Sequence, residues 1–406
     1  MKRLIALFAA VTAIGGSTAA VLSHKQADSF VTYEQTAPET GKALDAQTPQ
    51  AVVGTGFANE LDAYMPTDRN YMFSPLSIKT ALALAANGAE GETKEKMLEM
   101  LEIDDIDAFN AYTKQLIADA EKNDKAEFSI ADSIWLNEER LPGAKFSDDF
   151  EAKAKEFFAA EVKTVGYNDA VEKINSWCSE KTKGKINEMI DDPDFLAALI
   201  NAVYFKGEWS SRFKEENTHK MEFTDRDGNK KETDFMRQTD RFAFYEDKNT
   251  KIIRLPYADG KTAMYIALNN DKKLDILSYA DKMTSCKVHI ELPKFKTEFS
   301  CDLNDALAKL GAERAFNADF AEFKPMFKDF PADQNFYIDT VLHKTYIDVN
   351  ESGTEAAAAT AVMMRNCTTS VEKAEEIKEF IADKPFSYVI ADTETNEILF
   401  MGEQAY

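Results

Sequence analysis

The chain has 406 residues, and its 71 acidic and 48 basic side chains give a formal net charge of −23 at pH 7. Such an acidic chain is unsuited to binding nucleic acid or anionic membrane surfaces, since both attract basic proteins. No linker rich in proline and glycine divides the chain after residue 56, so we predict one large domain over residues 51–406.

The N-terminus is predicted to be an export signal over residues 1–23. Lys2 and Arg3 precede an apolar stretch, and small residues with a predicted cleavage site at Ala20 follow it. The uncharged run continues to residue 23, so an uncleaved signal that anchors the protein to a membrane is the alternative. Residues 24–50 are polar and rich in Gln, Thr, Ala and Pro, which predicts a disordered tether. We therefore expect a secreted, extracellular protein.

Hydrophobic periodicity predicts helices mainly in the first half of the chain and strands mainly in the second. The predicted helices cover residues 77–101, 108–122, 146–161 and 171–189, with a short helix at 302–310 that Gly311 closes. The predicted strands cover residues 127–136, 199–204, 234–245, 251–255, 262–269, 287–299, 336–350, 386–392 and 397–402. Helices that precede strands, without regular alternation, predict a mixed α+β fold.

The segment from His343 to Thr360 is the most informative part of the chain. It begins as a strand, and a run dominated by small side chains follows it: Gly353, Thr354, Glu355, Ala356, Ala357, Ala358 and Ala359. Small side chains lose little entropy on ordering and have no bulk that would prevent entry into a narrow gap. Alternate residues share one face of an extended strand, so the run is suited to act as a hinge and then as a strand added to a sheet. An ordinary helix is the alternative, because Ala and Met are strong helix formers.

Four separated blocks of the chain form a recognisable set. They are Phe73-Ser-Pro-Leu-Ser-Ile-Lys-Thr, Asn201-Ala-Val-Tyr-Phe-Lys-Gly-Glu-Trp, the hinge segment, and the pair Lys384-Pro-Phe-Ser-Tyr-Val with Ile398-Leu-Phe-Met-Gly-Glu. In this order and at this spacing they resemble the serpins, a family of serine protease inhibitors. The resemblance extends over residues 57–403. It implies the serpin fold, which has several helices, three β-sheets and a mobile reactive-centre loop.

The resemblance also implies roles for individual residues. Four residues match a polar cluster that holds the main sheet of serpins shut until the loop enters: Ser74, Ser77, Asn201 and His343. At the top of that sheet, Trp209 matches an aromatic plug, and Lys294 and Glu351 match a charged pair at the base of the hinge. A buried polar cluster suits a gate, because its hydrogen bonds hold one arrangement and can re-form in another.

The function implied by the resemblance is suicide inhibition of serine proteases. The protease forms an acyl-enzyme with the loop, the freed hinge inserts into the main sheet, and the distorted protease fails to deacylate. Counting sixteen positions from Glu351, as in inhibitory relatives, gives Cys367–Thr368 as the attacked bond. The small Cys367 suits elastase-like proteases, and Arg365 is the alternative, for a trypsin-like pocket. A non-inhibitory carrier, storage protein or chaperone with the serpin fold is the alternative function.

The sequence does not predict an enzyme. It contains no G-x-S-x-G, H-E-x-x-H or Walker motif, and its four histidines are not spaced as metal ligands, so we expect no metal and no cofactor. Lys114, Lys122 and Lys125 alternate with acidic residues, which argues against a polyanion cofactor such as heparin. We expect a monomer whose partners are serine proteases.

The cysteines and two short motifs bear on the compartment. We expect free thiols at all four cysteines, although export permits disulfides: Cys178, Cys286, Cys301 and Cys367. The glycosylation signals at Asn350 and Asn366 would place a glycan on the hinge or the loop and obstruct it. Together with the short export signal, these motifs predict a bacterial protein that never meets asparagine glycosylation.

Overall fold

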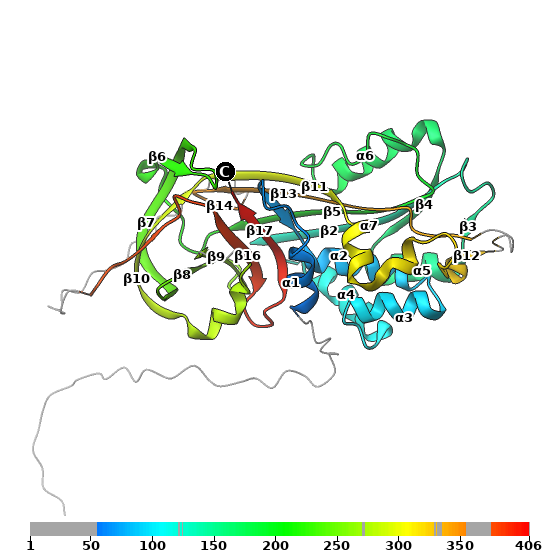
Figure 1. Ribbon diagram of the computed structural model, residues 1–406, viewed down its shortest axis with the longest axis horizontal. Coiled ribbons are helices and arrows are strands. Elements are labelled where there is room, and N and C mark those ends of the chain that lie inside the picture. The colour runs from blue at the N-terminus through cyan, green and yellow to red at the C-terminus, as the bar shows by residue number, and fades with distance from the viewer. Residues whose placement is uncertain are drawn as a thin grey trace, which may run out of the picture. The chain divides into compact units, whose positions relative to one another are not determined.

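Two large β-sheets carry the fold, and a sheet of two short strands accompanies them (Figure 1). The computed structural model describes residues 55–405 except 121, 124, 270–272, 329, 331–334 and 355–374. Within these residues, six strands form the first sheet in the order β11-β13-β14-β5-β2-β4. Nine form the second in the order β1-β17-β16-β9-β8-β7-β10-β15, with β6 paired to β7, and β12 pairs with β3.

The strands of each sheet have the following residue ranges. The six-stranded sheet contains β2 (Ala126–Asn137), β4 (Glu161–Val165), β5 (Ala197–Glu208), β11 (Phe295–Asp302), β13 (Thr340–Asn350) and β14 (Gly353–Thr354). The nine-stranded sheet contains β1 (Tyr71–Phe73), β6 (His219–Thr224), β7 (Lys230–Glu246), β8 (Thr250–Pro256), β9 (Thr262–Asn269), β10 (Thr284–Pro293), β15 (Lys378–Ile381), β16 (Phe386–Asp392) and β17 (Ile398–Gln404). The short pair is β3 (Lys145–Phe146) and β12 (Phe327–Lys328).

The helices belong mainly to the first half of the chain. They are α1 (Gly56–Asp62), α2 (Pro75–Ala86), α3 (Gly91–Met100), α4 (Ile106–Ala120), α5 (Asp148–Phe158), α6 (Ala170–Lys181) and α7 (Asn304–Leu307). A π-helical turn follows at Ala308–Ala312, and single 3-10 turns lie at Tyr167–Asp169, Glu215–Asn217, Ile276–Lys282, Glu313–Phe316 and Lys324–Met326. Within the described residues, no helix is both long enough and apolar enough to cross a membrane.

The six-stranded sheet is covered differently along its length (Figure 1). Helix α6 packs on one face, where Trp177 and Ile174 meet the alternate β2 residues Ala131 and Trp135. On the other face, one half of the sheet packs on α2 to α5, and the other half packs on the nine-stranded sheet. The six-stranded sheet is therefore buried on both faces around β2, β5 and β13. This agrees with the nearly continuous apolar sequence of β5, which would otherwise expose apolar side chains on one face.

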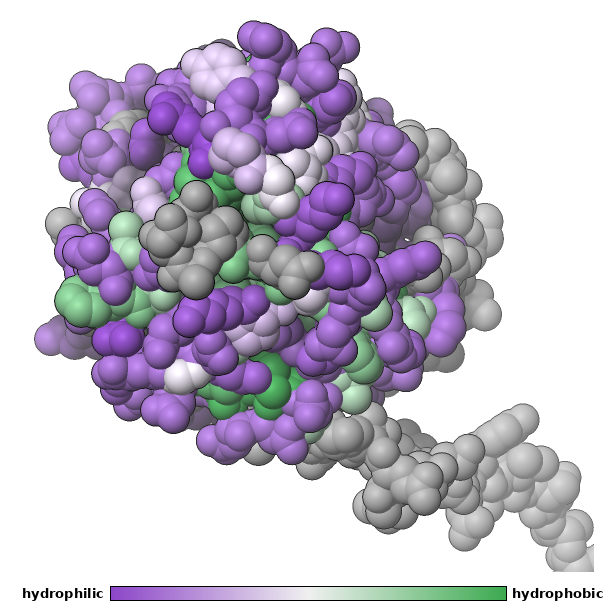
Figure 2. All heavy atoms as spheres, turned by 90° about the vertical axis from the view of Figure 1, so that its right-hand side faces the viewer, coloured by the Kyte–Doolittle hydropathy of each residue, from purple (hydrophilic) through white to green (hydrophobic). Residues whose placement is uncertain are grey.

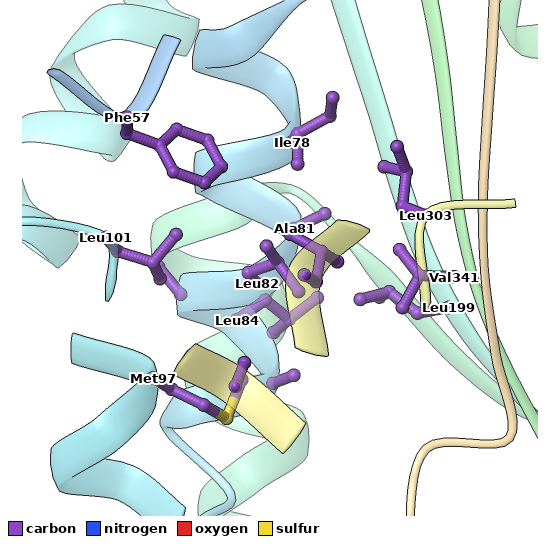
Figure 3. Close-up of a cluster of buried hydrophobic side chains, with 14 of the residues drawn as sticks. Phe57, Ile78, Ala81, Leu82, Leu84, Met97, Leu101, Leu199, Leu303 and Val341 are labelled. Atoms are coloured by element: carbon purple, nitrogen blue, oxygen red, sulfur yellow. The ribbon is translucent and has the colours of Figure 1, made fainter. Parts of the chain in front are cut away.

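Helix α2 lies at the centre of this packing and is buried along its whole length. Ser74 begins the helix as its N-cap, since its Oγ accepts a hydrogen bond from the Ser77 amide and Pro75 occupies the first turn. Figure 3 shows α2 side chains such as Leu82 between the neighbouring helices and the sheet, where Leu199 of β5 and Val341 of β13 lie. The helix thereby supports the two strands that meet in the candidate site.

The predicted mixed α+β fold is confirmed, but three predicted elements differ from the structure. The helix predicted at 77–101 is two helices, α2 and α3, because Gly91 adopts a φ of 56° where a helix would need a negative value. The strand predicted at 287–299 is two strands, β10 and β11, which join different sheets on either side of Lys294, directly after Pro293.

The helix predicted at 171–189 ends at Lys181. Lys183 and Gly184 adopt positive φ values of 54° and 77°, and the Thr182 hydroxyl binds the Cys178 carbonyl at 2.7 Å, so the backbone turns away from the helix axis. The other predicted helices and strands of the described residues overlap the observed ones. The predicted export signal (1–23) and tether (24–50) lie outside the described residues.

Cys178, Cys286 and Cys301 are free thiols, and Cys367 lies outside the described residues. Burial raises the pKa of both Cys178 and Cys301 to about 12, so these thiols stay protonated. Figure 2 shows that the face turned to the viewer is mostly hydrophilic, with small hydrophobic patches between polar side chains. The visible part of this face therefore offers no broad apolar surface of the kind that obligate interfaces use.

Candidate functional site

The hinge enters the six-stranded sheet as the two-residue strand β14. Gly353 pairs with Asn350 of β13 on one side and Glu208 of β5 on the other, and Thr354 pairs with Val349 and Gly207. Beyond this point β13 and β5 pair directly and in parallel, over seven positions from Thr340 to Tyr346. The sheet is thus parted by the hinge at one end and closed along the rest of the boundary between β5 and β13.

Only small residues fit where β14 enters. A Cβ atom on Gly353 would lie 2.0 Å from the carbonyl oxygen of Gly207, and one on Gly207 would lie 2.7 Å from the ring of Tyr257. Thr354 is fully buried, and its Oγ1 lies 2.7 Å from the Tyr257 hydroxyl. A Thr at this position buries no unpaired polar atom, because its hydroxyl has a partner in the sheet.

Trp209 closes the sheet above the hinge. Its indole Nε1 donates a hydrogen bond to the Asn350 carbonyl at 2.9 Å, and its amide donates to the Ser352 carbonyl at 3.0 Å. The indole also stacks on the ring of Tyr257, with centroids 4.7 Å apart. The predicted aromatic plug therefore contacts both the end of β13 and the tyrosine that binds Thr354.

Lys294 and Glu351 form the predicted charged pair beside Trp209. The Lys294 Nζ lies 3.0 Å from a Glu351 oxygen, and Thr218 donates a hydrogen bond of 2.7 Å to the other carboxylate oxygen. Partial burial opposes ionisation of Glu351, but the hydrogen bonds from Thr218 and Lys294 lower its pKa below the usual value. Glu351 is therefore a fixed anion at the point where β13 turns into the hinge.

Ser74, Ser77, Asn201 and His343 come together where β5, β13 and the start of α2 meet. His343 lies directly opposite Asn201 in the sheet, and its Nδ1 is 2.5 Å from the Asn201 Oδ1. The His343 Nε2 accepts a hydrogen bond of 3.1 Å from the Ser74 amide, which assigns the proton to Nδ1. Asn201 Nδ2 donates to the Ser77 Oγ at 2.5 Å.

His343 is fully buried and carries no charge at physiological pH. Burial lowers the pKa of its imidazole to about 3, because the charged form would lose its hydration. The bond between His343 and Asn201 crosses from β13 to β5, across the boundary that a new strand would have to enter. The cluster thus holds that boundary closed about six residues, or about 20 Å, from the hinge.

Two further residues belong to this cluster, and the sequence analysis did not find them. Asp132 of β2 accepts a hydrogen bond from the Asn201 Nδ2, and its other oxygen lies 3.0 Å from the Thr80 Oγ1 of α2. A signal for Asp132 was present in the sequence. Asp132 occupies a core-facing position between Ile130 and Ile134, in a strand whose other residues on that face are apolar.

The rest of the predicted site falls in the undescribed segment. The hinge residues Glu355 and Ala356 to Ala359, the attacked bond Cys367–Thr368 and the alternative Arg365 all lie outside the described residues. Where the structure is described, no group of three or more His, Cys, Asp or Glu side chains is placed to hold a metal ion.

Comparison with known proteins identifies the family. The model of the family described as serpin (serine protease inhibitor) matches residues 53–405. The chain belongs to the serpin family. It is 34% identical over 358 residues to the leukocyte elastase inhibitor of Xenopus laevis, a match that covers 82% of this chain and 92% of that protein. An uncharacterized serpin-like protein of Thermococcus kodakarensis is also 34% identical, over 82% of this chain and 80% of its own length.

Solved serpin structures agree with this assignment. The thermophilic serpin tengpin in its native state superposes with a TM-score of 0.78 at 29% identity, covering 90% of this chain and 95% of that one. Thyroxine-binding globulin superposes with a TM-score of 0.74 at 22% identity, over 87% of this chain and 98% of that one, which establishes the shared fold alone. The serpin is thus related to protease inhibitors, and its family consists typically of inhibitors and not of catalysts.

Proposed function

We propose that this serpin is a suicide inhibitor of serine proteases that traps the acyl-enzyme by loop insertion. The protease serine attacks the carbonyl carbon of Cys367, the Cys367–Thr368 peptide bond breaks, and the Thr368 amine leaves with the proton that the serine gave up. The residues before the bond, still esterified to the protease, then enter the six-stranded sheet between β5 and β13. Serpin loop insertion is an established example of strand addition to a sheet.

The observation that carries this proposal is the position of β14. Its two residues already pair with both β13 and β5, so the next residues of the loop would continue an existing strand and would not have to begin one. The thirteen residue-to-residue steps from Thr354 to Cys367 span about 43 Å when extended, so insertion would draw the bound protease toward the opposite end of the sheet. The alanines after Thr354 suit this path because they are small and uncharged.

The target is proposed to be an elastase-like protease. The position sixteen residues after Glu351 is Cys367, whose small side chain fits a shallow specificity pocket. Support comes from the relatives named leukocyte elastase inhibitor, to which the chain is 33–34% identical. A polyanion is not proposed as a cofactor, since Lys114 of α4 pairs with Glu156 at 2.9 Å and Lys122 pairs with Asp119 at 3.3 Å.

We also infer export through residues 1–23, with residues 24–50 as a tether, and action as a monomer outside a bacterial cell. The apolar segment between Arg3 and the small residues before Ala20 supports export. N-terminal sequencing of the protein recovered from the culture medium tests this directly. A product that starts near residue 21 agrees with a cleaved signal, and protein that stays with the membranes and keeps Met1 agrees with the anchored alternative.

A panel of elastase-, trypsin- and chymotrypsin-like serine proteases tests the inhibitory function. Each is mixed with the serpin, and complexes that survive boiling in SDS are resolved on a gel. An elastase-like enzyme should give such a complex, and mass spectrometry of the released peptide should show that it begins at Thr368. Cleavage of the loop without a stable complex by every protease would instead favour the non-inhibitory alternative.

A further inference from the structure

Asp132 is an acid in the interior of the gate formed by Ser74, Ser77, Asn201 and His343. Its side chain is almost completely buried at 2% exposure, and its hydrogen-bond partners are Asn201 and Thr80. No charged side chain among the described residues contacts its carboxyl group. The family resemblance gave this position no role, so the role of a buried carboxyl group without a cationic partner has to be inferred from its surroundings.

The groups that face Asp132 come from three elements and carry no charge. Helix α2 presents Ser77 and Thr80, β5 presents Asn201, and β13 presents His343 beyond Asn201. The one nearby lysine of α2, Lys79, lies instead over the ring of Phe109, with its Nζ 5.6 Å from the ring centroid. A carboxylate at position 132 would therefore be an anion without a cationic partner.

The hydroxyl of Thr80 has one proton and two acceptors within reach. Its Oγ1 is 2.8 Å from the Ser77 carbonyl oxygen and 3.0 Å from the Asp132 Oδ2. A hydroxyl donates one hydrogen bond, so an ionised Asp132 would compete with the Ser77 carbonyl for this proton. If Asp132 carries a proton on Oδ2, it donates to Thr80, Thr80 donates to Ser77, and both contacts are satisfied.

The remaining hydrogen bonds agree with a neutral Asp132. Its Oδ1 accepts from the Asn201 Nδ2, whose second hydrogen serves the Ser77 Oγ. Asn201 Oδ1 accepts from His343 Nδ1, and His343 Nε2 accepts from the Ser74 amide. Each of these donors has its acceptor, and with Asp132 protonated the cluster carries no charge, which avoids the cost of a buried, unpaired ion.

We propose that Asp132 is protonated in the closed gate and that separation of β5 from β13 releases this proton to solvent. The structural part of the proposal stands alone, and its consequence for inhibition rests on the proposed function. Burial also raises the pKa of Asp132 to about 7, although the hydrogen bonds that Asn201 and Thr80 can donate to the ionised form act to lower it. His343 is neutral in the closed gate, so Asp132 is the member of the closed gate that titrates near neutral pH.

The direction of the effect follows from linkage. The closed gate holds a proton that the opened gate, where water reaches the carboxyl group, would bind less strongly. The contribution of Asp132 should therefore make opening easier as the pH rises toward 7 and should level off above that value, where both states are ionised. His343, which can bind a proton once water reaches it, contributes in the opposite sense at lower pH, and this contribution is the same in a variant that changes Asp132 alone. Asp132 is thus a positioning residue. Its hydrogen bond orients the side-chain amide of Asn201, which in turn binds His343, and the protonation state of Asp132 determines how stable this arrangement is.

Infrared difference spectra test the protonation itself, independently of any protease. Asp132→Asn is the matched variant, since its amide NH₂ donates to Thr80 and its oxygen accepts from Asn201, as the neutral acid does. The spectrum of wild type minus variant should show the carbonyl band of a carboxylic acid at about pH 5.5 and lose it at about pH 8.5. The absence of this band at the lower pH would overturn the proposal.

Glu397 provides the control, because it is a second buried acid outside the gate. Burial raises the pKa of Glu397 to about 7, opposed by the charge of Lys79, so it titrates in the same range. Glu397→Gln should remove a separate band and leave the Asp132 band in place. If Asp132→Asn does not fold, Thr80→Val removes the hydroxyl that accepts the proton of Asp132, and the carbonyl band should then move to higher frequency, because the acid has lost its hydrogen-bond acceptor. An unchanged band position would contradict the assigned hydrogen bond.

Uptake of a synthetic peptide with the sequence of residues 353–364 tests the consequence for the gate. The ratio of the wild-type uptake rate to the Asp132→Asn uptake rate should rise roughly tenfold between about pH 5.5 and about pH 7.5, because any contribution of His343 is common to both proteins and cancels. Glu397→Gln should keep the wild-type profile. Equal profiles for wild type and Asp132→Asn would refute proton-linked gating, whether or not protease complexes form. A pH-dependent uptake without any protease complex would remove the proposed function and leave this inference intact.

Discussion

Replacing Thr354 with arginine should convert this serpin from an inhibitor into a substrate. Thr354 is fully buried in β14, where its hydroxyl pairs with Tyr257 and its neighbours leave space for a small side chain only. For the loop to insert, residue 354 must remain between β5 and β13. An arginine there would place a cation in a fully buried position, beside the Tyr257 ring and the backbones of β5 and β13.

The size of the effect follows from this burial. An uncompensated charge in such a site costs about 3–5 kcal/mol. Insertion competes with deacylation of the acyl-enzyme, and even about 3 kcal/mol in the barrier slows a step by roughly a hundredfold. Deacylation should then win at nearly every encounter, so the protease should be released active and the loop should be cut.

The assay is a titration of an elastase-like protease with wild type and variant, followed by SDS gels. Wild type should give a stable complex, and Thr354→Arg should give cleaved serpin with little or no complex. Thr354→Ser is the matched control, since it keeps the hydroxyl for Tyr257 and should retain the complex. An undiminished complex yield for the arginine variant would refute insertion at this position.

Three other predictions concern the same loop. Cleavage between residues 360 and 368 should raise the melting temperature, because an inserted strand gains a full set of sheet hydrogen bonds; a calorimetric scan that shows no rise would favour the non-inhibitory alternative. Gly353→Ala should weaken inhibition several-fold, since the new Cβ would lie 2.0 Å from the Gly207 carbonyl oxygen; an unchanged inhibition rate would mean that β14 is not needed. Arg365→Ala should leave elastase inhibition intact, whereas alkylation of Cys367 should slow it, because the added bulk no longer fits a small pocket. A peptide that begins at Asn366 after elastase treatment would move the attacked bond.

The sequence predicted the fold class more successfully than the details of strand pairing. Ser74, Ser77, Asn201 and His343 were predicted as a cluster from the resemblance, and the structure places them in contact. The sequence did not predict β14 as a separate strand. Two residues are too few to show a periodicity, and the strand forms only through pairing with β5, about 150 residues away in the chain. A strand this short can therefore be recognised from its pairing in the structure but not from the sequence.

Asp132 illustrates a second limit. A lone acid in an apolar strand is a sequence signal, but its meaning depends on Thr80 and Asn201, which lie 52 and 69 residues away along the chain. The broken strand at Lys294 shows the opposite case. Pro293 marked an interruption, yet only the assembled structure shows that the two halves belong to different sheets. Local patterns predict an element, and distant partners decide what it does.

In the proposed insertion mechanism the hinge and the gate are separate constraints on one movement, and variants should distinguish them. The hinge needs small side chains, because Gly353 and Thr354 pass within contact distance of Gly207 and Tyr257. The gate depends on matched hydrogen bonds, because the bond between Asn201 and His343 spans the boundary that would have to open for insertion. A hinge variant therefore acts after the protease has cut the loop and changes how many encounters end in a complex. A gate variant acts before any protease arrives, because it changes how readily the intact sheet parts, and its effect should persist when no protease is present.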